Sequence, residues 1–426
     1  MPATRSAPVP AHRPKGYLDT LLAKARVASR ALAAADRPAA LTAIAEGLSI
    51  GAPTVLEANA ADVAAEQARG TSAALVDRLR LSPERLAAIA RAVLQVADLP
   101  DPLGAAPTAW TLPNGLSVRR VSVPFGVIGM VYESRPNVTV DAAALALKAG
   151  SAAVLRGSSN ALASNRALVA SMRAALGRIG LPEDAVQLID SPDRELVTEL
   201  LRARGRVDLV IPRGGAGLIR HVVDTASVPV IETGVGNCHL YVDAAADLAM
   251  AGRLVMNAKV QRPGVCNAIE TLLVHERVAD EFLPRAAADL RAAGVRLYGC
   301  PRARAIVTGM DAAGDAEWGK EFLDLELAVR VVADLDEALE HIARFGTQHT
   351  EAIATRDADA AERFRREVDA AVVMVNASTR FTDGFEFGFG AEIGISTQKL
   401  HARGPLGLEQ IVTYKYLVDG DGQVRG

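Results

Sequence analysis

The side chain in this sequence best suited to covalent chemistry is the cysteine of the segment VQRPGVCNAIE, which spans Val260 to Glu270. Cys266 follows a Pro-Gly-Val sequence, and a glycine near a cysteine permits a turn that directs the thiol into a cleft. Such a turn also exposes backbone N–H groups, which can stabilise an oxyanion on an acyl group. The segment by itself also fits an inert core cysteine, so a nucleophile and a core residue both stay open.

The remaining cysteines offer less. Cys238 stands at the entrance of a predicted strand and Cys300 in a predicted loop, and we expect both to be inert. Three widely spaced cysteines do not form a disulfide framework, which indicates a reducing compartment. No Cys/His spacing typical of zinc is present, so we expect no structural metal. No histidine is an obvious catalytic partner for the thiol, because each of the following stands singly in the sequence: His239, His341, His349 and His401.

Two glycine-rich segments could hold phosphate groups. VIPRGGAGLIRHV carries Gly214 and Gly215 between a predicted strand and helix, and ETGVGNCH carries Gly234 and Gly236 after an apolar run. The free N–H groups at a helix start attract anions. The first segment lacks the third glycine of the dinucleotide fingerprint, because Arg220 takes its place. A phosphate-binding loop and a tight structural turn therefore stay open.

The composition excludes several classes of protein. The 426 residues are 50% hydrophobic and 23% charged, and the net charge is −3 with acids and bases interspersed. This balance favours neither nucleic acid nor an anionic membrane as a partner. No run of about 20 apolar residues suggests a membrane span. Residues 1–16 lack an apolar core typical of a secretory signal, so we expect a disordered tail on a cytoplasmic protein.

The elements that must position these residues follow from periodicity. Residues 17–100 predict successive helices, and in LSPERLAAIARAVLQV Ser82 can cap a helix that starts at Pro83. WTLPNGLSVRRVSV predicts a hairpin within residues 109–123, and LEQIVTYKYLV predicts a strand near 411–418. Strands and helices alternate from residue 125 onward and again after the cysteine. The sequence therefore predicts two doubly wound α/β domains in series.

Several segments in a fixed order resemble the aldehyde dehydrogenase superfamily, and within it the branch that acts on acyl phosphates. They include PFGVIGMVYESRPNVTVDAAALALKAGSAAVLRGSS, DLVIPRGGAGLI, NAKVQRPGVCNAIETLLV and EHIARFGTQHTEAI. The resemblance implies a cofactor-binding domain of residues 17–108 and 124–234 and a catalytic domain of residues 235–405. Residues 109–123 and 406–426 would then form a small β element for oligomerisation.

The resemblance also implies roles for individual residues. Cys266 takes the place of the nucleophile, and the Asn137 amide takes the place of the group that forms the oxyanion hole with the Cys266 N–H. The predicted cofactor-binding residues are Arg156, Ser158, Gly214, Gly215 and Glu321. Arg156 stands where many relatives have a lysine at the adenosine ribose, and with Ser158 it could meet the 2′-phosphate of NADPH. Glu321 would hold the nicotinamide ribose.

The implied reaction is the NADPH-dependent reduction of L-glutamyl 5-phosphate to L-glutamate 5-semialdehyde and phosphate, in proline biosynthesis. Arg262, Arg380 and Arg403 could bind the substrate's anionic groups, although each could instead form a structural ion pair. Glu232 stands where hydrolytic relatives keep a base, and we assign it no catalytic role because an acyl phosphate needs no activated water.

The expected partners are the small-molecule substrate and a second copy of the chain, and glutamate 5-kinase is a candidate. Two rival functions remain. One is an aldehyde dehydrogenase with another substrate, and the other is a non-catalytic scaffold for a proline-pathway kinase.

Overall fold

In the computed structural model, residues 16–104, 106–133 and 135–425 are described, so the predicted tail lies outside this part except for Gly16. The chain forms two compact units. Unit 1 comprises Met1–Glu232, Phe389–Ile393 and Leu406–Gly426, and unit 2 comprises Thr233–Gly388 and Gly394–Pro405. The assignment of a cofactor role to one predicted domain and a catalytic role to the other stays a prediction.

Unit 1 begins with helices, as predicted. They are α1 (Tyr17–Leu32), α2 (Arg37–Ile50), α3 (Ala52–Ala68), α4 (Ala73–Leu79) and α5 (Pro83–Asp98). Ser82 caps α5 by accepting a hydrogen bond from the Arg85 N–H, with Pro83 at the first helical position, which confirms this start. Among the described residues no single helix is long and apolar enough to cross a membrane. The pair α2 and α3 passes that test by length and composition but is bent by 66°.

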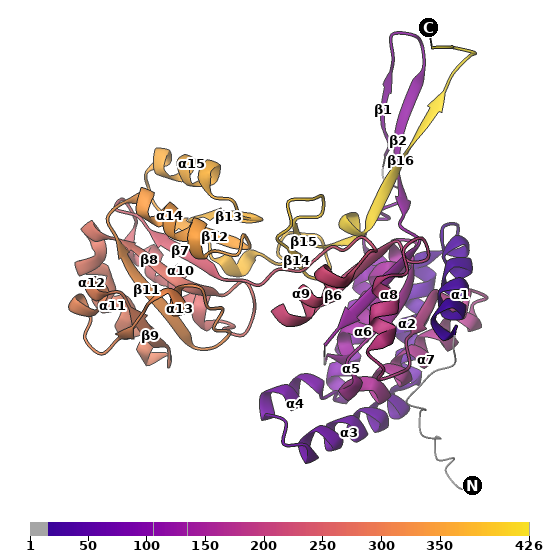
Figure 1. Ribbon diagram of the computed structural model, residues 1–426, viewed down its shortest axis with the longest axis horizontal. Helices are drawn as coiled ribbons and strands as arrows, with labels where there is room; N and C mark the ends of the chain where they lie inside the picture. The colour runs from indigo at the N-terminus through magenta and orange to yellow at the C-terminus, as the bar shows by residue number, and fades with distance from the viewer. Residues whose placement is uncertain (1–15, 105, 134, 426) are drawn as a thin grey trace. The chain divides into compact units, whose positions relative to one another are not determined.

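A four-stranded parallel sheet forms the centre of unit 1. Its strands are β3 (Val127–Tyr132), β4 (Ala152–Arg156), β5 (Val186–Leu188) and β6 (Leu209–Arg213), in the order β5-β4-β3-β6. The helices that follow them are α6 (Pro136–Lys148), α7 (Leu162–Arg178), α8 (Glu195–Leu201) and α9 (Ala216–Thr225) (Figure 1). The chain order reverses at β3, and in such sheets ligands bind beyond the carboxyl ends of the strands at this point.

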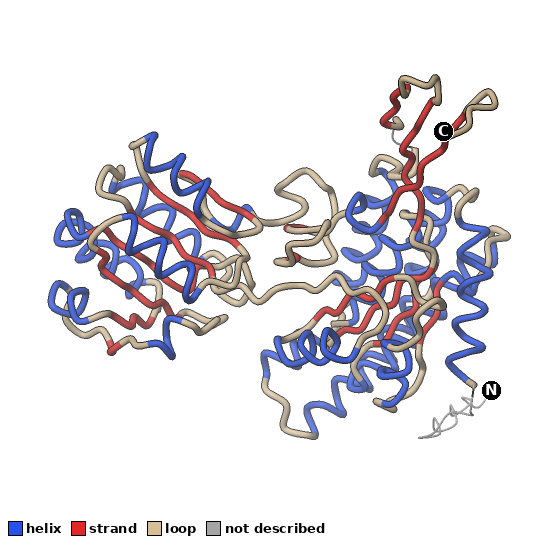
Figure 2. The backbone as a smooth tube through the Cα atoms, turned by 45° about the horizontal axis from the view of Figure 1, so that its top comes forward, coloured by secondary structure: helices blue, strands red, loops and turns tan. Residues whose placement is uncertain are grey.

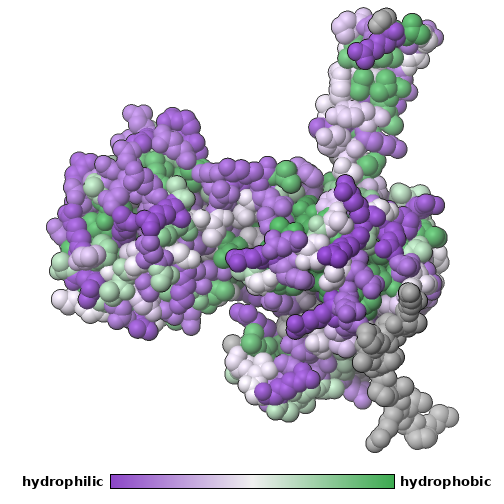
Figure 3. Space-filling view, in the orientation of Figure 1, coloured by the Kyte–Doolittle hydropathy of each residue, from purple (hydrophilic) through white to green (hydrophobic). Residues whose placement is uncertain are grey.

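An antiparallel arm extends from unit 1. The strands β1 (Thr108–Thr111), β2 (Ser117–Pro124) and β16 (Val412–Asp419) pair in the order β1-β2-β16, and they confirm the predicted hairpin and the predicted C-terminal strand (Figure 1). Figure 3 shows apolar and polar side chains interspersed on this arm. Trp110 and Tyr416, which meet edge to face, are 41% and 54% exposed. Exposed aromatic side chains on unpaired strand edges suit a partner chain.

Unit 2 contains a seven-stranded parallel sheet in the order β10-β9-β11-β8-β7-β12-β13. Its strands are β7 (Cys238–Val242), β8 (Ile269–His275), β9 (Arg296–Gly299), β10 (Asp311–Ala312), β11 (Glu326–Val332), β12 (Thr350–Ala354) and β13 (Val372–Val375). Its helices are α10 (Leu248–Val260), α11 (Glu276–Ala292), α12 (Pro301–Ile306), α13 (Asp315–Trp318), α14 (Leu335–Phe345) and α15 (Ala358–Glu367). A short antiparallel pair, β14 (Ile395–Ser396) and β15 (Gly404–Pro405), completes it.

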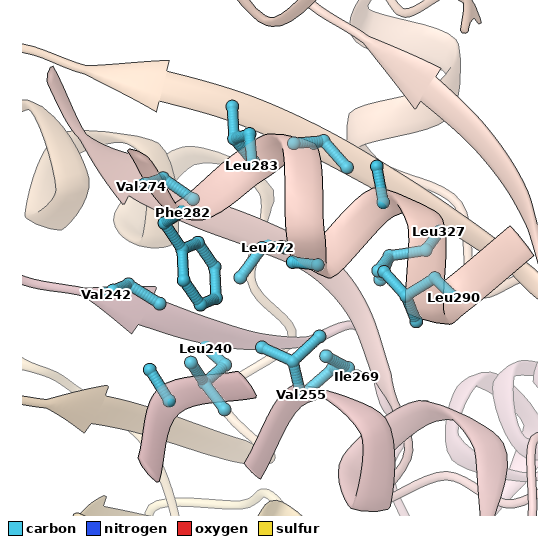
Figure 4. Packing of buried hydrophobic residues seen from close by; sticks show 14 of the residues in the cluster. Leu240, Val242, Val255, Ile269, Leu272, Val274, Phe282, Leu283, Leu290 and Leu327 are labelled. Carbon is cyan, nitrogen blue, oxygen red and sulfur yellow. The ribbon is translucent and has the colours of Figure 1, made fainter. Parts of the chain in front are cut away.

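Side chains on alternate positions of this sheet pack on opposite faces. Leu240 and Leu272 join the cluster under α10 and α11, which Figure 4 shows around Phe282. Tyr241 and Leu273, the next residues along the same strands, join the cluster under α14 and α15. Figure 2 shows the strands of each parallel sheet lying between helices. The predicted pair of doubly wound α/β domains is therefore confirmed.

Candidate active site

Cys266 lies in the turn between α10 and β8. The Ala268 N–H donates to the Val265 carbonyl at 3.0 Å and closes this turn, and Cys266 is half-buried. The backbone of Gly236 lies directly against it, since a Cβ atom on Gly236 would lie 1.6 Å from the Cys266 carbonyl oxygen. Only glycine fits at this position, so the preceding loop of unit 2 fixes the cysteine backbone.

Glu321 belongs to the same surroundings. Its Oε1 accepts a hydrogen bond of 2.7 Å from the Gly236 N–H. Burial raises the pKa of Glu321, and this hydrogen bond opposes the rise. The structure thus brings Glu321 to the glycine that supports the Cys266 turn. Its predicted contact with a nicotinamide ribose stays a prediction.

A buried ion pair joins the two ends of the cysteine turn. Lys259, in the last turn of α10, and Glu270, the second residue of β8, have fully buried side chains and meet at 2.6 Å. The second oxygen of Glu270 accepts from the Leu323 N–H at 3.1 Å. Burial raises the pKa of Glu270 to about 7, and Lys259 opposes the rise. Removing one member of such a pair leaves an uncompensated buried charge, so the pair holds both ends of the turn in place.

The predicted substrate arginines divide into two groups. Burial lowers the pKa of the Arg380 guanidinium, Arg262 lowers it further, and Asp383 and Cys266 oppose the shift. Arg380 and Arg262 therefore lie within electrostatic range of one another, and Arg380 within range of Cys266. Nε of Arg380 also donates to Gln261 Oε1 at 2.8 Å.

Arg403 is held differently. Its Nη2 pairs with Asp369 Oδ1 at 3.0 Å, and Lys399 pairs with the same carboxylate. The structure therefore gives Arg403 a structural ion pair. A contact of Arg403 with substrate stays a prediction.

The two other cysteines have structural surroundings. Cys238 is fully buried, its Sγ donates to the Cys266 carbonyl at 3.2 Å, and burial raises its pKa, which keeps the thiol neutral. Cys300 caps α12, because its Sγ accepts from the Ala303 N–H at 3.4 Å. Across the described ranges, no three His, Cys, Asp or Glu side chains gather to hold a metal ion.

Two of the histidines belong to a buried network. His239 Nδ1 lies 2.9 Å from Glu351 Oε2, and both side chains are buried. Burial lowers the pKa of His341 to about 2, helped by His239 and Arg330. His341 is therefore neutral across the physiological range and forms part of the core.

Asn137 lies in the first turn of α6, just beyond the carboxyl end of β3 in unit 1. Its Nδ2 donates to Asp141 Oδ2 at 2.9 Å. The two residues are four positions apart on one helix, a spacing that places side chains together. Sequence reasoning missed Asp141, although this spacing could have indicated it.

A cavity of about 600 Å³ lies in unit 1 beyond the carboxyl ends of the parallel strands. Its lining includes Tyr132, Glu133, Arg156, Gly157, Ser158, Ser159, Pro192, Arg194 and His221. The structure thus brings Arg156 and Ser158 to one cavity, at the place where doubly wound sheets bind ligands.

Arg156 provides the polar base of this cavity. Its side chain is buried, Nη1 donates to the Gly157 carbonyl and Nη2 donates to the Pro192 carbonyl at 3.3 Å. Its Nε has no hydrogen-bond partner within the described ranges. A buried donor of this kind fits an anionic or hydroxylated ligand such as a nucleotide.

Gly214 and Gly215 precede α9 near the same cavity. The Gly215 N–H donates to Glu133 Oε2 at 3.0 Å, so a side-chain carboxylate already occupies the start of this helix. Sequence reasoning missed Glu133. Both glycines lie at the predicted edge of the sheet, but their contact with a cofactor stays a prediction.

Comparisons with known proteins agree with this architecture. The model of the aldehyde dehydrogenase family matches residues 19–302. Gamma-glutamyl phosphate reductase of Moorella thermoacetica is 57% identical over 405 residues, which cover 94% of this chain and 97% of that one. The enzyme of the same name from Thermobifida fusca is 56% identical over the same shares of both chains.

Solved structures extend the likeness to three dimensions. The crystal structure of gamma-glutamyl phosphate reductase from Thermotoga maritima has a TM-score of 0.94 and 49% identity, and the match covers 96% of this chain and 100% of that one. An acetylating aldehyde dehydrogenase from Geobacillus thermoglucosidasius, at 17% identity and a TM-score of 0.68, shares the fold over 96% of this chain and 97% of its own.

Proposed function

The chain belongs to the gamma-glutamyl phosphate reductases of the aldehyde dehydrogenase family, and we propose that it reduces L-glutamyl 5-phosphate with NADPH. The products are L-glutamate 5-semialdehyde and phosphate, and the reaction is the second step of proline biosynthesis from glutamate. The observation that carries the proposal is the identity of 57% over 94% of the chain, which includes both units.

The first chemical step uses Cys266 as the nucleophile. Its thiolate attacks the acyl carbon, a C–S bond forms, the C–O bond to phosphate breaks, and phosphate departs with the electron pair. The side-chain amide of Asn137 and the backbone N–H of Cys266 stabilise the oxyanion of the tetrahedral intermediate. Arg380 supports this assignment, because it interacts electrostatically with Cys266 and a cation favours the thiolate.

The residues present in unit 1 fit a dinucleotide. The cavity beyond the sheet, the buried Arg156 and the neighbouring Ser158 would hold its phosphate and ribose groups, with Gly214 and Gly215 nearby. Glu321 of unit 2 would hold the nicotinamide ribose. A bound NADPH supplies the hydride that reduces the thioester carbon. Collapse of the thiohemiacetal then releases the aldehyde and restores the Cys266 thiolate.

Glu232 stands where hydrolytic relatives keep a base, and an acyl phosphate substrate needs no such base. It is half-buried at the end of the first segment of unit 1. We assign it no role as a base, because phosphate rather than water is the partner of the acyl group in both directions. Replacing Glu232 should therefore change turnover far less than replacing Cys266.

The arm of β1, β2 and β16 is the proposed contact between subunits. Its exposed aromatic side chains and unpaired strand edges support this role. Glutamate 5-kinase stays a predicted partner.

The reverse reaction tests the proposal directly. The enzyme is mixed with glutamate 5-semialdehyde and NADP+, with and without inorganic phosphate. NADPH formation is followed by the absorbance of the reduced nicotinamide at about 340 nm. We expect turnover that depends on phosphate. Turnover without phosphate would indicate a hydrolytic aldehyde dehydrogenase, and no turnover in any condition would favour the scaffold.

A further inference from the structure

A second, smaller hollow lies in unit 1 beside Asn137. It has a volume of about 70 Å³ and is formed by the segment after β3, by α6, by the end of β6 and by the segment 389–393. Its polar lining consists of Arg135, Asn137, Asp141, Arg213 and Glu392, and its apolar lining of Met130, Val138, Ala142 and Ile393. Two cationic and two anionic side chains thus converge on a space that none of the steps above uses.

Asp141 is one of the two anionic residues of this lining. Its carboxylate accepts one hydrogen bond, from Asn137 Nδ2, and within the described residues no other hydrogen bond or ion pair reaches it. An ionised carboxylate offers about four acceptor sites. Burial raises the pKa of Asp141 to about 6, with Asn137 and Arg213 opposing the rise, so the group is ionised at neutral pH. Its remaining acceptor sites are available for a cationic ligand.

Arg213, the last residue of β6, is one of the two cationic residues of this lining. It is half-buried and close enough to Asp141 to oppose the rise in that pKa. In the part of the chain that the structure describes, its guanidinium forms no ion pair or hydrogen bond, although carboxylates share the hollow with it. A guanidinium in this position can accept an anionic ligand in a bidentate geometry.

We propose that this hollow binds the amino-acid end of the substrate, with the α-ammonium group on Asp141 and the α-carboxylate on Arg213. The inference rests on the proposed function and adds the groups that select a glutamyl chain. Glu392 and Arg135 also line the hollow, so it holds one further charge of each sign.

The size and place of the hollow match this end group. About 70 Å³ holds roughly five groups of the size of a water molecule, at about 10 to 15 Å³ each. The amino-acid end has five non-hydrogen atoms: the nitrogen, the α-carbon and the three carboxylate atoms. The rest of the substrate would extend past Asn137, which is hydrogen-bonded to Asp141 on the same helix face. A zwitterion at Asp141 therefore places the acyl carbon on the Asn137 side.

Three aldehydes and two variants test the assignment of each charge. Glutamate 5-semialdehyde is compared with 5-oxopentanoate, which lacks the ammonium group, and with 4-aminobutanal, which lacks the carboxylate. The value of kcat/KM is measured for each with NADP+ and phosphate. We expect the wild type to favour the complete substrate by roughly 100-fold or more over either analogue, because each analogue leaves one protein charge unpaired.

Each variant should remove one preference only. Asp141→Asn keeps the shape and should reduce the preference over 5-oxopentanoate to about tenfold or less, with the preference over 4-aminobutanal retained. Arg213→Gln should do the reverse. Asp62→Asn is the matched control. Asp62 is a carboxylate of the same unit, and burial also raises its pKa, but it accepts a hydrogen bond from the Ser164 hydroxyl and does not line the hollow. This variant should change neither preference.

The outcomes separate the two levels of the proposal. If wild type does not oxidise glutamate 5-semialdehyde with phosphate, the proposed function itself fails. If wild type is active but both variants lower kcat/KM equally for all three aldehydes, the hollow is structural and the inference is wrong. If Asp141→Asn does not fold, the Arg213→Gln comparison alone decides, because it removes only the preference for the carboxylate.

Discussion

The two α/β units place their candidate site residues at opposite ends of their strands. In unit 1 these residues follow the strands: Glu133 comes after β3, Arg156 ends β4, and Gly215 comes after β6. In unit 2 they precede the strands: Gly236 comes before β7 and Cys266 before β8. One sheet thus uses its carboxyl edge and the other its amino edge.

The electrostatics of the two edges differ. The carboxyl edge of a parallel sheet meets the starts of the following helices, whose partial positive charge attracts anions, and Glu133 already occupies one such start at α9. The amino edge meets helix ends, and α10 ends just before the Cys266 turn. A helix end disfavours an anion such as a thiolate. The proposed Cys266 thiolate would therefore need stabilisation from side-chain cations, and Arg380 interacts electrostatically with Cys266.

Replacing Cys266, the proposed nucleophile, should abolish the reaction at the amino edge of the unit 2 sheet and leave the cavity at the carboxyl edge of the unit 1 sheet intact. Cys266→Ser should lower kcat for phosphate-dependent semialdehyde oxidation by about 10⁴-fold or more, because a serine hydroxyl is a weak nucleophile without an adjacent base. NADPH binding, measured by fluorescence titration, should change little. Retained turnover would contradict the covalent mechanism, and lost NADPH binding would show that the two edges do not act separately.

The next largest effect should come from the backbone that supports Cys266, the proposed nucleophile. Gly236→Ala places a Cβ atom 1.6 Å from the Cys266 carbonyl oxygen, so the turn must move. Overpacking costs about 1 to 3 kcal/mol, and a backbone contact this short should reach the upper end of that range. We expect a lower melting temperature and a kcat reduced by roughly 100-fold, since small displacements of a reacting group have effects of this order.

Gly252→Ala in α10 is the matched control. It meets no heavy atom within 4 Å and should stabilise the helix slightly, by up to about 1 kcal/mol. An equal loss of activity in both glycine variants would show that the contact with the Cys266 backbone is unimportant.

Local patterns in the sequence predicted most of the fold. The long helices and apolar strands have clear periodicities, and the caps at Ser82 and Pro83 start α5 as expected. Short elements such as β5, with three residues, and α13, with four, were not predicted, because three or four residues are too few to show a hydrophobic periodicity.

The site was less accessible to sequence reasoning. The local sequence singled out Cys266 but left its role open, and the resemblance supplied its role and that of Asn137. The contact between Gly236 and Cys266 joins residues that are distant in the sequence. No local pattern encodes such a contact. The pair of Lys259 and Glu270 is of the same kind, since their burial depends on the packing of α10 and β8. Only Asp141 could have been found locally, from its helical spacing to Asn137.

Removing a charge from the unit 1 cavity, at the carboxyl edge of the sheet, should have a moderate effect on the KM for the cofactor. Arg156→Ala removes the buried guanidinium of the unit 1 cavity and should raise the KM for NADPH by roughly tenfold, but the KM for NADH much less, because only NADPH carries the 2′-phosphate. Steady-state kinetics with both cofactors checks this. Arg166→Ala, which breaks an ion pair with Asp190 on the same unit, is the control and should affect both KM values equally little. An equal rise with both cofactors for Arg156→Ala would remove the 2′-phosphate role.

The smallest expected effect concerns stability and pH in the same unit. The pKa of Asp141 rises from 3.8 to about 6 on folding, so between these values the folded protein holds a proton that the unfolded chain has released. The contribution of Asp141 to the free energy of unfolding is therefore most favourable below about pH 4. It is lost as the pH rises through about 6, and the loss amounts to at most about 3 kcal/mol. Arg135, Arg213 and Glu392 line the same hollow, and of these three Arg213 opposes the rise in the pKa of Asp141. In Asp141→Asn the decrease in unfolding free energy between pH 4 and 7, measured by urea titration, should be smaller than in wild type.

An unchanged pH profile would show that Asp141 is well solvated, and the carboxyl edge would then be less buried than the amino edge that holds Glu270.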